Sequence, residues 1–507
     1  MNSLSFQEYP KEPVVVDRLS VKFMKQCRFI PLGMNKEVLR VAMADPEDFY
    51  TVDSLRIGYG VDVEVVKGQE EDILDAIERL YGAGSQSLEM IIEEAGKDKD
   101  IYDISAEGKE DVDHLRDLAS EAPIIRLVNR LILNAVEVRA SDIHFEPFEN
   151  EFKVRFRIDG VLHDVESPPK RLQAAIISRV KIMAKLDIAE RRLPQDGRIK
   201  LKISNREIDF RISTIPTLFG ESLVMRVLDS ETLIMDLDNL GFPESLLSEY
   251  LELISQPYGM VLVTGPTGSG KTSTLYTTLA KINSSENKII TLEEPVEYQL
   301  KGVNQIQVKP KIGLTFASGL RSIVRQDPDI ILVGEIRDRE TAEIAIQSAL
   351  TGHLLFSTLH TNDATGAISR LLDMGVESFL LSSTLLGVLA QRLVRVICPY
   401  CKEPYKPEEK LLKSMGIGPK EAAEVTFYTG KGCEECRHTG FRGRTAIFEY
   451  LPVDDDIRKE ITQRSSTERV KDVAIKKGLL TLRQDGWSKV KEGKTTISEV
   501  LRVTLEK

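Results

Sequence analysis

Residues 261–272 read Val-Leu-Val-Thr-Gly-Pro-Thr-Gly-Ser-Gly-Lys-Thr, and this stretch decides the fold of the sequence around it. It contains the pattern Gly-x-x-x-x-Gly-Lys-Ser/Thr, in which glycines allow backbone N–H groups to turn toward an anion. We expect Lys271 to reach the β- and γ-phosphates of a nucleotide and the Thr272 hydroxyl to bind Mg²⁺. The predicted phosphate loop comprises Gly265, Pro266, Thr267, Gly268, Ser269, Gly270, Lys271 and Thr272.

The sequence on both sides of the loop supports this interpretation. Residues 260–263 form an apolar run typical of a buried parallel strand, and residues 273–281 have a helical pattern. A helix that begins at the loop would direct the positive end of its dipole at the bound anion. The alternative, a glycine-rich turn without a ligand, does not explain both flanks. We therefore predict an NTP-binding α/β domain.

Acidic residues and histidines accompany later strands of the same domain. Glu293 and Glu335 each follow an apolar run, and the C-terminal ends of core strands beside a phosphate loop are where Mg²⁺ and the attacking water are held. His353 and His360 bracket the apolar run at 354–359. We interpret both histidines as γ-phosphate sensors, with ordinary core histidines as the alternative.

Four of the five cysteines form two pairs with the spacing of metal ligands. Cys398 and Cys401 are separated by two residues, as are Cys433 and Cys436. Each pair can hold one metal ion through a tight turn, and four thiolates make a closed tetrahedral site typical of structural zinc. The fifth, Cys27, stands alone and is interpreted as a small core residue.

Composition limits the class of protein. The chain has 507 residues and a net charge of −11, which argues against sequence-independent binding to nucleic acid. We find no signal peptide and no run long enough to span a membrane. The best candidate for a span, residues 379–394, is interrupted by Gln391 and Arg392, and we predict a packed helix there.

The first part of the chain is predicted to hold a small α/β module in residues 17–81, with Asp45-Pro46 starting one of its helices. This module contains no catalytic chemistry and is interpreted as a docking domain, with a purely structural role as the alternative. The segment that follows, up to His114, is acidic and predicted to be a flexible linker.

A second domain precedes the nucleotide-binding domain. Strands are predicted at 198–203 and 207–212, joined by a turn at Asn205-Arg206. Arginines such as Arg211 and Arg226 are usually surface charges. Their place before an NTPase core also permits them to act on the phosphates of a neighbouring subunit.

Taken together, these motifs resemble the bacterial type II secretion ATPases, the E proteins of the general secretory pathway. They belong to a superfamily that includes the type IV pilus ATPases. One departure is Glu294, because the family's acidic box reads Glu-Asp-Pro where this chain has Glu-Glu-Pro. The resemblance covers nearly the whole chain and rests on the phosphate loop and on residues 141–144, 194–198, 291–298, 320–338, 351–362 and the four paired cysteines.

The resemblance implies a RecA-like P-loop NTPase core of the α/β class. A mixed α/β, PAS-like second domain, a small N-terminal docking domain and a tetracysteine zinc insert accompany it. The expected boundaries are 1–82 for the docking domain, 83–114 for the linker, 115–237 for the second domain, and 238–507 for the ATPase domain with its insert at 396–445.

The family also implies a homo-hexamer that hydrolyses ATP with Mg²⁺ to drive pseudopilus assembly and protein export, with type IV pilus assembly as the alternative. The expected partners are the cytoplasmic domain of a bitopic inner-membrane protein (L-type) and a polytopic platform protein (F-type), with no nucleic acid. The protein would be cytoplasmic and held at the inner membrane by these partners. The implied site residues are Glu335 and Glu293 at the water, Arg211 and Arg226 reaching the active site, His353 and His360, and Arg321, Arg325 and Arg337 from the Walker B region.

Overall fold

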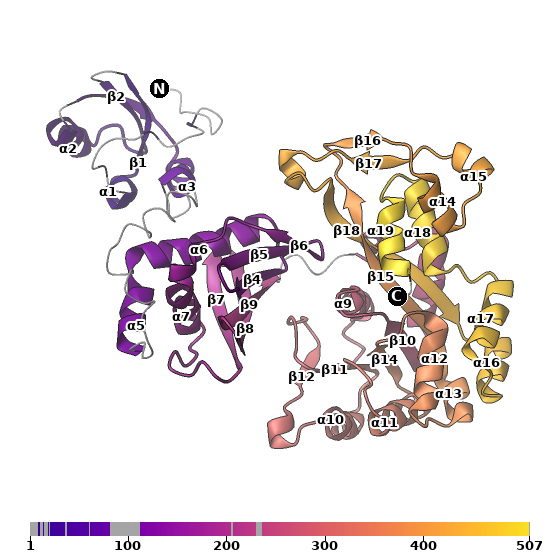
Figure 1. The fold of residues 1–507 in the computed structure, drawn as a ribbon. Helices are drawn as coiled ribbons and strands as arrows, with labels where there is room; N and C mark the ends of the chain where they lie inside the picture. Colours follow the sequence, from indigo (N-terminus) through magenta and orange to yellow (C-terminus); the bar gives the residue numbers. More distant parts are fainter. Residues whose placement is uncertain are drawn as a thin grey trace. The chain divides into compact units, whose positions relative to one another are not determined.

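The structure of the 507-residue chain is a computed structural model. It divides into two compact units, Met1–Leu228 and Asp229–Lys507 (Figure 1). No described helix has the length and apolarity that a membrane crossing requires. The described residues are 9–10, 14, 19, 21–35, 38–59, 61–81, 112–203, 206–229 and 236–505.

The N-terminal part of the first unit is a three-stranded sheet with three helices packed around one core. Strand β2 pairs antiparallel with β1 and parallel with β3. Helix α2 begins at Phe49 rather than at Asp45-Pro46, because Asp48 caps it by accepting a hydrogen bond from Thr51 N at 3.1 Å. The elements are α1 (Val21–Gln26), β1 (Phe29–Asn35), β2 (Val38–Met43), α2 (Phe49–Tyr59), β3 (Asp62–Lys67) and α3 (Glu70–Tyr81).

The second part of this unit is a six-stranded sheet in the order β6-β5-β4-β9-β8-β7. Apolar side chains on one face of the sheet pack with those of α6 and α7 into a single core. Since side chains alternate along a strand, the other face carries the polar residues. The elements are α5 (Val112–Ser120), α6 (Ala122–Glu137), β4 (Asp142–Pro147), β5 (Phe152–Ile158), β6 (Val161–Asp164), α7 (Gln173–Met183), β7 (Gln195–Ile203), β8 (Arg206–Thr217) and β9 (Gly220–Asp229).

Two predictions for this unit need correction. Helix α5 already begins at Val112, so residues 112–114 are not linker, and the rest of the predicted linker lies outside the described residues. Arg206 pairs with Ile203 in the β7–β8 ladder, so it belongs to a strand rather than to the turn. Residues 204 and 205 lie outside the described residues.

The second unit is built on a seven-stranded sheet in the order β12-β11-β13-β14-β10-β15-β18. All of its strand pairs are parallel except β15–β18, which is antiparallel. Strand β10, which precedes the phosphate loop, lies inside the sheet between β14 and β15, as predicted for a buried parallel strand. The strands are β10 (Gly259–Thr264), β11 (Ile289–Glu293), β12 (Asn304–Gln307), β13 (Ile330–Val333), β14 (Leu354–Leu359), β15 (Leu385–Ile397), β16 (Lys402–Pro404), β17 (Tyr428–Gly430) and β18 (Phe441–Pro452).

Alternating residues of the central strands enter two different cores. Met260 and Leu262 of β10 belong to one apolar cluster, whereas Val261 and Val263 belong to another. Both faces of the sheet are therefore covered, as expected of parallel strands that read as continuous apolar runs. The helices are α8 (Glu244–Ile254), α9 (Lys271–Ile282), α10 (Phe316–Ile323), α11 (Arg339–Leu350), α12 (Ala364–Asp373), α13 (Ser378–Thr384), α14 (Glu409–Met415), α15 (Pro419–Ala423), α16 (Asp455–Thr462), α17 (Thr467–Lys476), α18 (Leu482–Lys491) and α19 (Ile497–Thr504).

The prediction of one packed helix at 379–394 is wrong from Leu385 onward. Helix α13 ends at Thr384, and β15 begins at once with Leu385. Buried strands and buried helices give similar apolar runs, so periodicity alone does not separate them. Here the pairing of β15 with β10 on one side and β18 on the other decides the conformation.

Candidate nucleotide site and metal centre

The predicted phosphate loop connects β10 to α9 at the C-terminal edge of the parallel sheet. Gly265, Gly268 and Gly270 all have positive φ angles, of 152°, 79° and 90°. A side chain on Gly265 would come within 2.5 Å of the carbonyl oxygen of Gln391, so this position also requires glycine for space. The loop therefore has the backbone of an anion-binding nest at the start of a helix.

A glutamine from the neighbouring strand holds the loop from inside the protein. Gln391 of β15 donates from Nε2 to the Ser269 carbonyl at 2.9 Å and accepts from the Thr274 hydroxyl at 2.7 Å. Gln391 is 1% exposed, so both bonds are shielded from water. Sequence reasoning noted this glutamine only as an interruption of an apolar run; a polar residue inside a buried strand beside the loop was the available signal.

Lys271 folds back over the loop. Its Nζ donates to the carbonyl oxygens of Gly265 at 2.7 Å and Pro266 at 3.1 Å. Burial lowers the pKa of Lys271 to about 8; the negative charge of Glu335 opposes this shift, and the positive charge of Arg392 adds to it. An anion in the loop would stabilise the charged lysine, so nucleotide and proton are expected to bind together.

Glu335 interacts with Lys271 through its charge and contacts Arg337 and His360 directly. It follows β13 and lies 2.6 Å from Arg337 Nη2 and 3.3 Å from His360 Nε2. Burial by itself would raise the pKa of Glu335, but Arg337 and then His360 hold it below its ordinary value. Arg337 also contacts Glu294 at 2.9 Å, which gives the unusual residue of the acidic box a partner.

Glu293 is buried, and three side chains donate to it. The hydroxyls of Tyr276 and Thr291 bond its two oxygens, and Gln305 Nε2 lies 3.2 Å from Oε1. Burial, together with the charge of Glu293, raises the pKa of Tyr276. With 4% exposure, Glu293 is less accessible to water than Glu335. Thr291 is on the same strand as Glu293, whereas Tyr276 and Gln305 come from α9 and β12 and were not singled out from the sequence.

The two candidate histidines lie at opposite ends of β14. His360 follows the strand and reaches Glu335, as described above. His353 precedes the strand: its carbonyl accepts from Gly259 N at 3.1 Å, and its Nδ1 is 2.8 Å from the Ser348 carbonyl. The six-residue strand β10 separates Gly259 from the loop, roughly 17 Å along the chain. The structure therefore brings His360, but not His353, to the phosphate loop of its own chain.

Arg321 of α10 and Arg325, which follows that helix, have partners outside the phosphate loop. Arg321 pairs with Glu340 at 2.6 Å, and Arg325 donates to the Arg321 carbonyl at 2.8 Å. Within the described part of the chain, neither forms an ion pair or hydrogen bond with the phosphate loop. Of the three Walker B arginines, only Arg337 meets the Glu335 cluster.

Arg211 and Arg226 lie on adjacent strands of the first unit. Arg211 of β8 stands between Phe210 and Ile212, which are buried in the core, so its side chain lies on the polar face of the sheet. Arg226 of β9 faces Asp142 of β4, with Nε 3.1 Å from Oδ1. The side chain of Arg226 remains 55% exposed, so it can contact another molecule.

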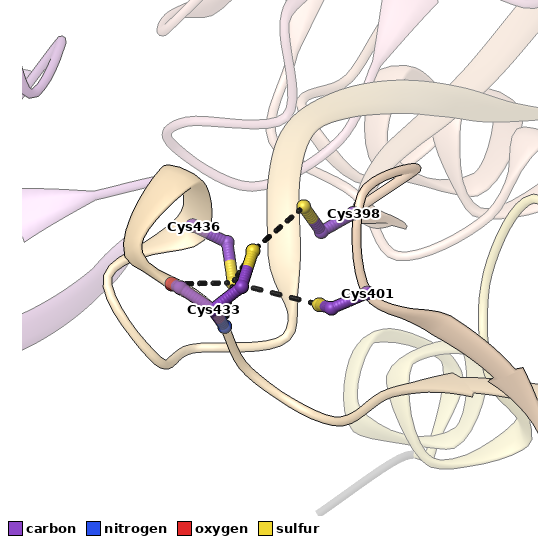
Figure 2. Close-up of side chains that lie close together, drawn as sticks. All are labelled: Cys398, Cys401, Cys433 and Cys436. Carbon is purple, nitrogen blue, oxygen red and sulfur yellow. Dashed lines mark hydrogen bonds between the residues drawn. The ribbon is translucent and has the colours of Figure 1, made fainter.

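The four paired cysteines converge on one point (Figure 2). Their Sγ atoms all lie within 4.8 Å of one another, and three separations are 3.7, 3.7 and 3.9 Å. A tetrahedron with Zn–S bonds of about 2.3 Å has edges of about 3.8 Å. Disulfides, with S–S of about 2.05 Å, do not fit these separations. The donor set therefore fits a closed tetrahedral zinc site.

Backbone N–H groups prepare these sulfurs to bind a cation. The Cys436 Sγ accepts from Cys433 N at 3.2 Å and from Gly440 N at 3.3 Å. Burial opposes ionisation, but these donors lower the pKa of Cys436 to about 6. Burial and the neighbouring sulfurs raise the pKa of Cys401 to about 12. A divalent cation would stabilise the thiolate form in which cysteines bind a metal.

The segment between the cysteine pairs packs on the C-terminal helices. Trp487 of α18 donates from Nε1 to Glu421 of α15 at 2.7 Å. Its ring lies 6.0 Å from that of Phe427, measured between centroids. The cysteine cluster thus joins the two ends of a segment that packs over Trp487.

Comparison with known proteins shows what the chain resembles. The family "Type II/IV secretion system protein" matches residues 117–502, and the MshEN domain matches residues 2–87. The type II secretion system protein E of Xanthomonas campestris pv. campestris is 52% identical over 96% of this chain and 85% of its own length.

Two further relatives extend the comparison. The type IV pilus assembly ATPase PilB of Myxococcus xanthus is 46% identical over 98% of this chain and 88% of its own length. The crystal structure of the pilus retraction motor PilT with bound ADP is 27% identical, covers 74% of this chain and 96% of its own, and has a TM-score of 0.52. Both the sequence and the fold therefore resemble those of secretion and pilus motors.

Proposed function

The chain belongs to the type II/IV secretion system protein family, and from this premise we propose that it is the ATP-hydrolysing motor of a type II secretion system. Hydrolysis of ATP is coupled to the export of proteins. The observation that carries the proposal is the phosphate loop with Lys271 and Glu335 at one edge of a parallel sheet. A bound nucleotide and a water molecule can both be held at that edge.

The chemistry follows from these residues. The loop amides and Lys271 bind the phosphates of ATP, and Thr272 and Glu335 hold Mg²⁺ and its waters. Glu335 orients the attacking water, because it is the more accessible of the two candidate carboxylates. Glu293 acts behind it by fixing the end of β11 and α9 through Tyr276. His360 orients Glu335 through the contact at 3.3 Å.

Arg211 and Arg226 complete the site from a neighbouring subunit of a hexamer. Their exposed sheet face and positive charge suit the negative charge that develops on the γ-phosphoryl group. Mixing Arg211→Ala chains with Lys271→Ala chains tests this idea. Some interfaces would then combine a sound loop with a sound arginine, and hydrolysis should partly recover. Full activity of an Arg211→Ala/Arg226→Ala variant would return both residues to the role of surface charges.

Zinc holds the insert in place through the four cysteines and takes no part in the reaction, because four protein ligands leave no position for water. The N-terminal domain docks on the cytoplasmic part of an L-type inner-membrane protein, and an F-type platform protein receives the force. The motor therefore works at the cytoplasmic face of the inner membrane. Capture of the L-type domain by the full chain, but not by a chain lacking residues 1–81, would support this docking.

A second candidate is the assembly of type IV pili, favoured by the 46% identity to PilB over 98% of the chain. The two functions share the hydrolysis of ATP and differ in the machinery that the motor drives, a secretion system or a type IV pilus. A strain that lacks the gene separates them when wild-type and Glu335→Gln chains are returned to it. Restored protein export with unchanged pili supports secretion. Restored pili with unchanged export would transfer the proposal to pilus assembly.

A further inference from the structure

A buried arginine lies directly behind the phosphate loop. Arg392 of β15 is 7% exposed. A Cβ atom built on Gly265, the first glycine of the loop, would lie 3.1 Å from its Nη1. The same point is 2.6 Å from the hydroxyl of Ser269, which is buried and has no hydrogen-bond partner among the residues that the structure describes. The guanidinium group therefore faces the inner side of the loop.

Carboxylates act on this charge only from a distance: Glu449 and Asp363 raise the pKa of Arg392 against the effect of its burial. Arg392 forms no ion pair within 4 Å among the described residues. The nearest carboxylates are engaged elsewhere: Asp363 pairs with Lys471 at 2.9 Å, and Glu449 accepts from Ala364 N at 2.9 Å. Burial of a charge without a counter-charge is costly. The loop interior thus carries positive charge beyond that of the loop lysine.

The same arginine joins the loop to the segment after β14. Its Nη2 donates to the Asn362 carbonyl at 2.9 Å and to Asn362 Oδ1 at 3.2 Å. Its Nη1 donates to the Gln391 carbonyl at 3.3 Å. Asn362 stands two residues after His360, the residue that contacts Glu335. Arg392 therefore bridges the phosphate loop and the segment that orients the catalytic glutamate.

We propose that Arg392 is a positioning residue of the nucleotide site, whose buried charge is neutralised by the phosphates bound in the loop and whose bond to Asn362 sets the His360 segment. This inference rests on the proposed function. Burial lowers the pKa of Arg392, and the positive charge of Arg392 in turn lowers that of Lys271. In both side chains burial is the main cause of the lowered pKa, and a phosphate bound in the loop would favour the charged form of each.

The first test replaces the charge. We expect Arg392→Gln to weaken binding of MgADP by about tenfold, because the phosphates lose the attraction of one unit charge in surroundings with an effective dielectric constant of about 20. Arg392→Lys keeps the positive charge but cannot make both hydrogen bonds to Asn362. Its MgADP affinity should therefore be close to that of the wild type, while its kcat stays low. Arg395→Gln is the matched control. Arg395 lies on the same strand but pairs with Glu499 at 2.6 Å, and its loss should lower the melting temperature without changing MgADP affinity.

The second test supplies the missing carboxylate. Asn362→Asp places a negative charge where Oδ1 now accepts from Arg392. In protein without nucleotide, this variant should melt at a higher temperature than the wild type. MgADP should bind it less tightly, because the charge of Arg392 is already neutralised. In an Arg392→Gln background, the same substitution should give no gain in melting temperature.

Two results would overturn the inference. One is a folded Arg392→Gln variant that binds MgADP as the wild type does. The other is a fall in the melting temperature of Asn362→Asp without nucleotide, which would mean that Arg392 carries no unbalanced charge. Both are distinct from failure of the proposed function itself, in which the wild type and a Lys271→Ala variant would bind MgADP equally.

Discussion

Loss of the metal centre should release the segment that covers Trp487. We consider a Cys433→Ser/Cys436→Ser variant, in which the second cysteine pair no longer meets the first. Structural zinc contributes about 10–16 kcal/mol in small metal-bound domains. This is comparable to the roughly 5–15 kcal/mol by which whole domains are stable. The insert should therefore detach from the C-terminal helices in this variant.

The contacts of Trp487 with the insert give the size of the stability loss. Trp487 would lose its tilted ring contact with Phe427, worth about 0.5–1.5 kcal/mol, and its hydrogen bond to the Glu421 carboxylate, worth about 1.5–3 kcal/mol. Together these amount to about 2–4.5 kcal/mol. The melting temperature of the second unit should fall by about 4–10 °C.

The assay uses the single tryptophan of the chain. Trp487 is 9% exposed with the insert in place, so its emission should shift to longer wavelength in the double variant. Elemental analysis should show one zinc per wild-type chain and none in the variant. Cys27→Ser, which removes the unpaired cysteine, is the control and should change neither signal. Zinc loss with unchanged tryptophan emission would refute the idea that zinc holds the insert against the C-terminal helices. Retained zinc would refute the ligand set.

Three further predictions concern the nucleotide site. Arg337→Ala should move the acidic limb of the pH–rate profile to higher pH, because Arg337 no longer holds the pKa of Glu335 down and the carboxylate is needed in its ionised form. Nucleotide affinity should fall as pH rises above about 8, where Lys271 loses its proton in the protein without nucleotide, and Lys271→Arg should abolish this pH dependence in a titration of MgADP binding. Tyr276→Phe should cost about 1.5–3 kcal/mol in urea unfolding, because Glu293 loses a donor in a buried position; an unchanged midpoint would contradict the hydrogen bond.

The sequence predicted the parts of the fold that a motif or a spacing determines locally. The loop pattern requires a strand before it and a helix after it, and β10 and α9 occupy those places. The paired cysteines likewise predicted a cluster that the structure brings together. In both cases the information lies within a few neighbouring residues or in a rare residue type.

Features that depend on distant segments were not predictable in this way. An apolar run such as 385–394 becomes a strand because β10 and β18 offer it hydrogen bonds, and its own sequence does not contain that fact. Two of the three donors around Glu293 come from distant segments, α9 and β12. Arg392 interrupts an apolar run in the sequence, and only the sheet order places it behind the phosphate loop.

The most direct test of the account is ATP hydrolysis by purified wild-type and Lys271→Ala chains. Lys271 contacts loop carbonyls rather than the core, so the variant should melt close to the wild-type temperature. We expect steady release of phosphate by the wild type and none above background by the folded variant. Hydrolysis at the wild-type rate by a folded Lys271→Ala chain would contradict the central claim that this loop is the site of ATP turnover.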